Sequence, residues 1–356
     1  MRIEKRHFGH TPPGHPVTRF TLHNDRGTCV SIIDLGAAVQ SIWVPDREGG
    51  VDDIVLGYGD AAGYWHDTHY VGAAIGRYAN RIAHGRFVLD DTVCVLSRNY
   101  GLHHLHGGKA GFDKHLWKAE PVAGADRIGL TLKRVSEHGE EGYPGNLAVT
   151  VHYSLNNDNE LRIQYQAQTD RATPVNLTHH GYFNLSGNHQ AAIDAHIVWI
   201  NADSFLPVDA AFIPTGEIAP VSDTPLDFRH PTVIRERIDA GDAQLERVGG
   251  YDHNWVLNAW DGTLRRQASV YDKASGRLLE VWTSEPGLQF YSGNSLHSRF
   301  PGKGGRPYRR RQGLCLETQH FPNSPNQPEF PSTILRPGET YRSETVYRFM
   351  LKADRD

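Results

Sequence analysis

The sequence predicts an all-β protein, a large antiparallel β-sandwich with very little helix. Three observations predict this fold class. Short segments alternate apolar and polar residues with a period of two, which is typical of strands with one buried face. Turn residues separate these segments, because 36 glycines and 20 prolines are scattered through the chain. No repeat of fixed period is visible, so one sandwich domain spanning residues 1–356 is predicted rather than a propeller or solenoid.

The clearest strand pair lies in the middle of the chain. Residues 147–153 alternate Leu, Val, Val and Tyr with smaller or polar residues, and residues 161–167 repeat the pattern. Residues 156–159 between them are Asn, Asn, Asp and Asn, which tolerate turn geometry. The segment therefore predicts an antiparallel hairpin.

Other segments of the same kind predict further strands, at 17–23, 29–33, 39–44, 128–135, 192–200, 278–283 and 345–351. One stretch, 232–239, follows Pro231 and has a modest helical pattern. Helix is therefore expected to be a minor component.

Composition excludes several classes of protein. Lys and Arg number 37 against 41 Asp and Glu, and no long basic run is present, so a nucleic-acid partner is not expected. Residues 1–16 lack the apolar stretch of a secretory signal, and no run of about 18 apolar residues could span a membrane. The three cysteines, Cys29, Cys94 and Cys315, are too sparse for a disulfide framework. A cytoplasmic protein is expected.

Four segments place polar side chains inside the strand-like pattern, where burial is costly unless the groups have partners or a task. The first is 76–82, which contains Asn80 and Arg81. Arg81 could donate two hydrogen bonds to vicinal oxygens. Taken alone, the segment favours surface ion pairing over a binding role.

The second segment, 102–108, has three histidines within four positions. A period of two would place His104 and His106 on one face, which is how strand-borne ligands approach a metal ion. The chain has 21 histidines, however, and no neighbouring Cys or Glu completes a ligand shell. No metal is therefore predicted at this segment.

The third segment, 174–185, would as a strand place Asn176, Thr178, His180 and Tyr182 on one face. Such a polar face is typical of a pocket wall, although a histidine hydrogen-bonded at a strand end would give the same pattern. The fourth, 313–322, has a carboxylate, Glu317, inside an apolar strand.

The alternation along that fourth strand places Cys315, Glu317 and Gln319 on one face. A buried acid is a candidate for acid–base chemistry or for a structural ion pair. Two further segments add Asp252 and Gln289 next to aromatic residues, a mixture that suits a sugar.

Together and in this order, the segments resemble the galactose mutarotase (aldose 1-epimerase) family from about residue 21 to residue 351. The motifs that carry the resemblance are Ala79, Asn80, Arg81 and Ile82; Leu105, His106, Gly107 and Gly108; Gly111, Phe112, Asp113 and Lys114; Asn176, Leu177, Thr178 and His180; Tyr182, Phe183, Asn184 and Leu185; Asp252, His253 and Asn254; Leu316, Glu317, Thr318 and Gln319.

The resemblance implies a β-supersandwich whose open cleft binds a free hexose, galactose or glucose, and interconverts its α and β anomers without a metal or other cofactor. By this resemblance Glu317 is the general base for the O1 hydroxyl and His180 the general acid for the ring oxygen. His106 then supports the ring-oxygen region.

In the same family pattern Asn80, Arg81, Asp252 and Gln289 hold the hydroxyls or line the cleft. Three positions depart from the pattern: His179 and Gly181 stand where Asn and Ser are commoner, and His320 where Asn is commoner.

Three other functions compete with this interpretation. A metal-dependent hydrolase would use His104, His106 and His180, and would lose activity on chelation. A sugar-binding module would not need both an acid and a base. A glycosidase would want two carboxylates across the scissile bond. The sequence does not separate galactose from glucose, arabinose or xylose, and a monomer or weak dimer is expected.

Overall fold

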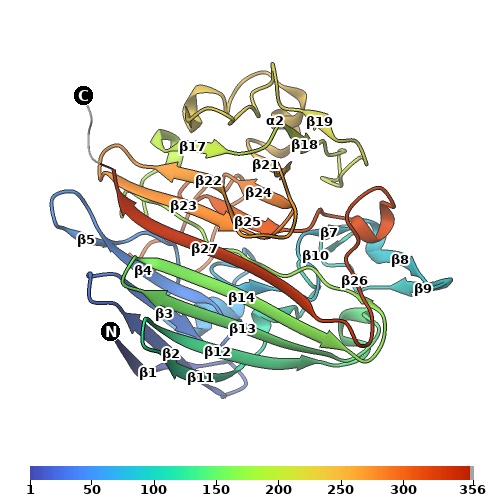
Figure 1. Cartoon of the computed structure of the whole chain (residues 1–356), viewed down its shortest axis with the longest axis horizontal. Helices are drawn as coiled ribbons and strands as arrows, with labels where there is room; N and C mark the ends of the chain where they lie inside the picture. Colours follow the sequence, from blue (N-terminus) through green and yellow to red (C-terminus); the bar gives the residue numbers. More distant parts are fainter. Residues whose placement is uncertain (353–356) are drawn as a thin grey trace.

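A nine-stranded antiparallel sheet forms the centre of the protein (Figure 1). The computed structural model describes residues 1–352. In spatial order the strands are β11 (Lys118–Ala123), β12 (Arg127–Ser136), β13 (Leu147–Asn156), β14 (Glu160–Thr169), β27 (Tyr341–Leu351), β23 (Arg277–Thr283), β22 (Arg265–Tyr271), β17 (Ile197–Ile200) and β20 (Thr232–Val233). The last long strand, β27, pairs with β14 on one side and β23 on the other, so the end of the chain joins the two halves of the sheet.

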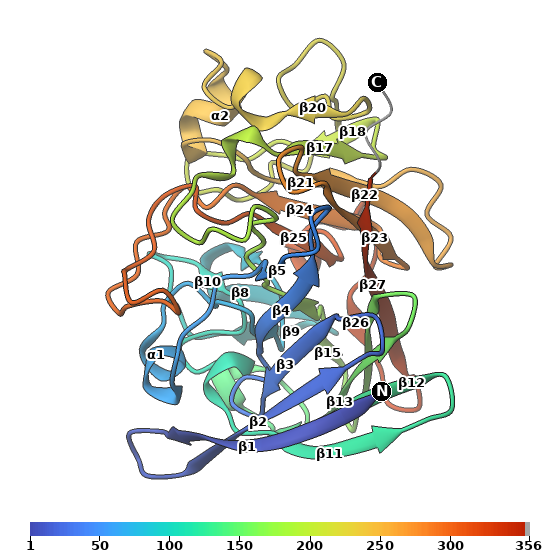
Figure 2. The ribbon, with the colours of Figure 1, turned by 90° about the vertical axis from the view of Figure 1, so that its left-hand side faces the viewer.

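Two five-stranded antiparallel sheets accompany the central one. The first consists of β1 (Arg2–His10), β2 (Pro16–His23), β3 (Cys29–Ile33), β4 (Val39–Pro45) and β5 (Val51–Asp53) in that order. The second has the order β19 (Ala219–Pro220), β18 (Ser204–Leu206), β21 (Asp252–Val256), β24 (Gly287–Tyr291) and β25 (Cys315–Gln319). Figure 2 shows the first sheet lying across the strands β11–β13, with the second sheet above it.

Short two-stranded ribbons complete the strands. They are β6 (Ala74–Ile75) with β16 (Thr178–His179), β7 (Arg81–Ile82) with β10 (His104–Leu105), β8 (Arg86–Leu89) with β9 (Thr92–Val95), and β15 (Thr173–Pro174) with β26 (Ile334–Leu335). Two of them position the site described below: β7 carries Arg81, and β16 directly precedes His180.

One face of the central sheet builds the main core. On its long strands, alternate residues such as Leu132, Val151 and Tyr347 are buried in one contiguous apolar cluster. Residues of both five-stranded sheets, such as Ile32 and Phe290, belong to the same cluster. The three sheets are thus held by one layer of side chains, as in a sandwich.

Helix is sparse, as predicted, but it is not where the sequence pattern placed it. The expected helix at 232–239 is wrong: the structure has the strand β20 followed by a 3₁₀ turn, Ile234–Glu236. The two α-helices of the described residues are α1 (Ala61–His66) and α2 (Ala243–Val248). Neither of them is long and apolar enough to cross a membrane.

Most of the predicted strands are confirmed within a few residues. The hairpin predicted around 156–159 is β13–β14, with Leu155 opposite Leu161. The segment 192–200 is an exception, because it begins with a 3₁₀ turn, Ile193–Ala195, and becomes a strand only at Ile197.

Candidate active site

A cleft of about 700 Å³ lies against the second five-stranded sheet. It is lined by six of the seven predicted site residues: Asn80, Arg81, His106, His180, Asp252 and Glu317. These residues come from segments more than 200 positions apart in the chain, so the fold brings them together. The seventh, Gln289, lies in a small adjoining cavity that it shares with Asp252 and Arg81.

Strand alternation aims Glu317 into the cleft. Leu316 on β25 and Phe290 on β24 point into the main core, so their neighbours Glu317 and Gln289 project from the opposite face of the sheet. Glu317 and Gln289 are direct cross-strand partners, and Gln289 is in turn opposite Asn254 on β21. A row of polar side chains therefore crosses three strands, from the cleft at Glu317 to the adjoining cavity at Gln289 and Asn254.

His180 follows the short strand β16. Its backbone is fixed in both directions, because its N–H donates to the carbonyl of Ala73 and its carbonyl accepts from the N–H of Gly72. The next residue back, His179, points into the core, where its ring packs near Tyr153 and Tyr347. His180 consequently faces the cleft.

His106 is oriented by a backbone hydrogen bond. The N–H of Asn80 donates to Nδ1 of His106 over 3.1 Å, so the neutral ring carries its proton on Nε2. Both residues have a positive φ, 64° for Asn80 and 51° for His106. Gly107 must follow, since a Cβ there would lie 1.8 Å from the carbonyl oxygen of Gly76.

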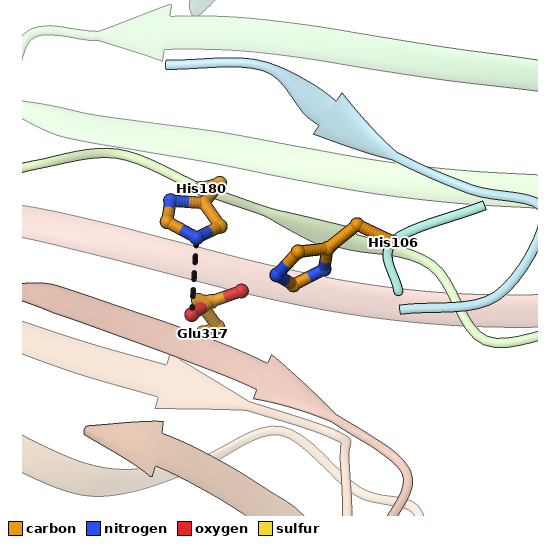
Figure 3. Close-up of side chains that lie close together, drawn as sticks. All are labelled: His106, His180 and Glu317. Atoms are coloured by element: carbon orange, nitrogen blue, oxygen red, sulfur yellow. Dashed lines mark ion pairs between the residues drawn. The ribbon is translucent and has the colours of Figure 1, made fainter. Parts of the chain in front are cut away.

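The three side chains converge on one point (Figure 3). Nε2 of His180 is 3.6 Å from a carboxylate oxygen of Glu317, and the rings of His106 and His180 meet edge to face at 5.1 Å between centroids. One nitrogen from each ring and one carboxylate oxygen lie within 4.8 Å of one another. A small molecule at this point would meet all three groups.

Burial shifts the pKa values of the trio in the directions that favour their uncharged forms. It raises the pKa of Glu317 well above its usual value, and the neighbouring Asp252 adds to this increase. It lowers the pKa of His180 to about 3 and that of His106 well below the usual range. Burial thus favours the neutral form of each of these groups over its charged form.

Arg81, Asn80 and Asp252 form the polar wall next to the trio. Nη2 of Arg81 is 3.5 Å from one oxygen of Asp252, and Gln289 donates to the other oxygen over 2.7 Å. Gln289 Oε1 is buried and has no hydrogen-bond partner among the described residues. The arrangement leaves donors of Arg81 and an acceptor of Gln289 available for hydroxyl groups.

Aromatic rings complete the cleft, and sequence reasoning missed most of them. Tyr70 packs over His106 at 4.7 Å, and Tyr182 packs beside His180 at 5.1 Å. Tyr291, Tyr100 and Phe212 also line the cavity. Tyr291 could have been found from strand alternation with Gln289, whereas Tyr70 sits in a turn with φ 58° that no periodic pattern marks.

Two face assignments from the sequence are wrong. His104 does not share a face with His106: its Nε2 meets the hydroxyl of Tyr143 and its Nδ1 the carbonyl of Ser97. Asn176 and Thr178 do not line the cleft with His180. Asn176 hydrogen-bonds both backbone groups of His320, and Thr178 donates to the carbonyl of Thr318. The strands here are two residues long, too short for alternation to persist.

The three departures from the family pattern lie behind the cleft. A Cβ at Gly181 would fall 2.6 Å from Cε1 of His179, so the glycine makes room for the imidazole. His320 turns toward Glu285, with Nδ1 2.5 Å from its carboxylate. None of these three residues lines the cleft.

The tautomer of the His106 ring argues against a metal ion at the trio. A metal ion would need a lone pair on the nitrogen of His106 that faces the cleft. That nitrogen is Nε2, and the donor at Nδ1 makes it the protonated one. His104, the other histidine in the metal hypothesis, points elsewhere.

Comparisons with known proteins agree with this geometry. The sequence profile described as aldose 1-epimerase matches residues 18–348. The galactose mutarotase of Rattus norvegicus is 44% identical over 343 residues, covering 96% of this chain and 97% of the rat protein. The aldose 1-epimerase of Escherichia coli (strain K12) is 40% identical over 341 residues, covering 95% and 97%.

Solved structures give the same result. A galactose 1-epimerase from Lactobacillus acidophilus superimposes with a TM-score of 0.86 at 26% identity, covering 99% of this chain and 100% of the bacterial one. An aldose epimerase homologue from C. elegans gives 0.85 at 29% identity, covering 94% and 98%.

Proposed function

Because this chain belongs to the aldose 1-epimerase family, we propose that it interconverts the α and β anomers of free hexoses, galactose and glucose first among them. The chain is thus an isomerase that acts on carbohydrates. We place galactose first because the rat and human relatives of this chain are named galactose mutarotase. We add glucose because it differs from galactose in the orientation of a single hydroxyl.

Two proton transfers open the sugar ring. Glu317 accepts the proton of the anomeric O1 hydroxyl while His180 donates a proton to the ring oxygen. The C1–O5 bond then breaks and C1 becomes an aldehyde carbon. Rotation about C1–C2 presents the other carbonyl face, and the reversed transfers close the opposite anomer.

Burial favours the open-chain stage of this cycle. Attack on the cyclic sugar requires an ionised Glu317 and a protonated His180. Once the ring is open, Glu317 holds the proton and His180 is neutral. That neutral pair is the state that burial stabilises, since it raises the pKa of Glu317 and lowers that of His180. Ring opening thus removes a buried charge pair, which lowers the free energy of the aldehyde complex.

The other side chains bind and orient the sugar. His106 offers Nε2–H toward the ring-oxygen region, because Asn80 occupies its Nδ1. Arg81 offers its forked donors to two hydroxyls, and Asp252 accepts from a hydroxyl while Gln289 holds its other oxygen. The mixture of forked donors and acceptors suits a polyol.

The single observation that carries the proposal is the meeting of Glu317 and His180 at 3.6 Å inside a cleft large enough for a hexose. We also infer a cytoplasmic protein that is a monomer or weak dimer, folds as one domain, and takes a small aldose rather than nucleic acid or a membrane as its partner. The modest formal charge of −4 supports the absence of a nucleic-acid partner.

A polarimetric assay tests the proposed function. Freshly dissolved α-galactose, α-glucose, arabinose and xylose are followed to anomeric equilibrium with and without the protein. We expect a faster approach to the same final rotation, with the largest acceleration for a hexose. An unchanged rate for all four sugars would contradict the proposal.

A further inference from the structure

Polar contacts hold the guanidinium of Arg81 only loosely. Nη1 is 3.3 Å from Oδ1 of Asn80 and Nη2 is 3.5 Å from Asp252, both longer than the usual 2.7–2.9 Å of a charge-assisted hydrogen bond. Nε is buried and has no hydrogen-bond partner among the described residues. The side chain is nevertheless only 8% exposed. Something other than these polar contacts must fix its position.

Two aromatic rings pack against this guanidinium. The central carbon of the Arg81 guanidinium lies 5.0 Å from the ring centroid of Tyr100 and 5.3 Å from that of Phe212. The two rings are themselves 6.3 Å apart. Both distances to Arg81 are within the range of cation–π attraction, which is strongest where water is excluded.

The chain builds both rings into the cleft from distant loops. Tyr100 belongs to a tight turn in which its N–H and carbonyl bond to His103. Phe212 has φ 64° and is presented by a loop that Asp209 closes, accepting from Ala211 and Ile213. Both rings line the cavity. Two separate segments therefore converge on one arginine at the cleft.

We propose that Tyr100 and Phe212 form an aromatic clamp that positions Arg81 for two-point binding of sugar hydroxyls. The two rings are much closer to each other than the sum of their distances to the guanidinium carbon, so both lie on one side of the group. They restrain Arg81 by contact without accepting hydrogen bonds, so its remaining N–H donors stay available to the substrate. This inference rests on the proposed function, because it assumes that Arg81 binds the sugar. Tyr100 and Phe212 act through Arg81 and are positioning residues.

The test compares mutarotation kinetics of Tyr100→Leu, Phe212→Leu and the double variant in two backgrounds, wild type and Arg81→Ala. In the wild-type background each single change should raise KM about 2–5-fold and the double change about tenfold, with kcat within about twofold. Tyr100→Phe keeps the ring and should retain most of the affinity, since no hydrogen bond to the hydroxyl of Tyr100 is present in the described residues. In the Arg81→Ala background the same changes should cause no further decrease in kcat/KM relative to Arg81→Ala alone.

A matched control removes an aromatic ring that packs on a different arginine. Trp199 packs on Arg266 at 4.8 Å, and neither residue lines the cleft. Trp199→Leu should therefore leave KM unchanged, which separates loss of the clamp from general loss of an arginine–aromatic contact.

The outcomes distinguish this inference from the proposed function. An unchanged kcat/KM in Arg81→Ala would refute the role of Arg81 itself. If Arg81→Ala is impaired but the Tyr100 and Phe212 variants have wild-type KM, the clamp alone is wrong. Equal losses from the ring variants in both backgrounds would also overturn it, because the rings would then act on the sugar or the fold without Arg81.

Discussion

A carboxylate oxygen of Glu317 lies 3.6 Å from Nε2 of His180, with the two side chains 2% and 5% exposed. At this distance, and with so little water, the charge on one group affects the protonation of the other. In the proposed mechanism the pair holds one proton. That proton can sit on either partner at the same net charge, as the two proton transfers require.

The pH dependence of kcat/KM should therefore lack the inflection of an ordinary histidine. A second proton is gained only well below pH 6.5, because burial lowers the pKa of His180 to about 3. The shared proton is lost only well above the usual value for a carboxylic acid, because burial raises the pKa of Glu317. We therefore expect the acid limb of the profile to lie near pH 3 and not near 6.5, after subtraction of the uncatalysed rate. An acid limb with its midpoint near pH 6.5 would contradict the shared-proton account.

Chelation should leave the activity intact. The nitrogen of His106 that faces the cleft carries a proton, so the trio lacks one of the three lone pairs that a metal site would need there. The measurement is the mutarotation rate after exhaustive dialysis against a chelator, with metal content determined in parallel. Activity that disappears and returns on adding zinc would favour the metal-hydrolase hypothesis instead.

His179 and Gly181 should behave as a packing pair. Gly181→Ser places an atom where the imidazole of His179 lies, and overpacking of this kind costs about 1–3 kcal/mol of unfolding free energy. Replacing the imidazole with a smaller side chain, in His179→Asn/Gly181→Ser, should recover part of that loss. Denaturant unfolding measures both variants, and a double variant no more stable than Gly181→Ser would show that the two positions are independent.

The ion pair of His320 and Glu285, whose side chains are 19% and 2% exposed, should make stability depend on pH. Burial lowers the pKa of His320, but the charge and hydrogen bond of Glu285 outweigh it and the net pKa is raised. The stabilisation is therefore complete below the unfolded value of about 6.5 and is lost as pH rises through the higher folded value.

Breaking this pair with His320→Asn should cost about 3–5 kcal/mol at pH 6 and less at higher pH. Unfolding free energies of wild type and variant across this range provide the test, with the exposed His7→Asn as control. A gap between wild type and His320→Asn that widens with rising pH would show the sign to be wrong.

The long strands could be predicted because their alternation reports which face is buried. The hairpin of β13 and β14 has this pattern over its whole length, and its register follows from the Asn-rich turn. The false helix at 232–239 shows the limit of a weak pattern. The true helix α2 has clear signals at its ends, an Asp242 N-cap and Gly249 at its C-terminus, which do not depend on hydrophobic periodicity.

The residues of the candidate site could be predicted from motifs. Which of the neighbouring side chains face the cleft could not. Alternation placed Glu317 correctly because β25 is a regular strand between two others. It failed for His104 and for Asn176, which lie on or next to strands of only two residues. After His104, the positive φ of His106 also redirects the chain. The aromatic residues Tyr70 and Phe212 come from turns whose direction only tertiary contacts determine.

The most direct test of the account is the turnover of Glu317→Gln, His180→Asn and the double variant, measured by polarimetry. Glu317→Gln keeps size and hydrogen bonding but cannot accept the O1 proton, so kcat should fall by about 10²–10⁴ while the protein stays folded. His180→Asn should cost a similar factor. The double variant should lose far less than the product of the two factors, because the pair acts as a unit. If Glu317→Gln turned over galactose, glucose and the pentoses at the wild-type rate, the mechanism would be wrong.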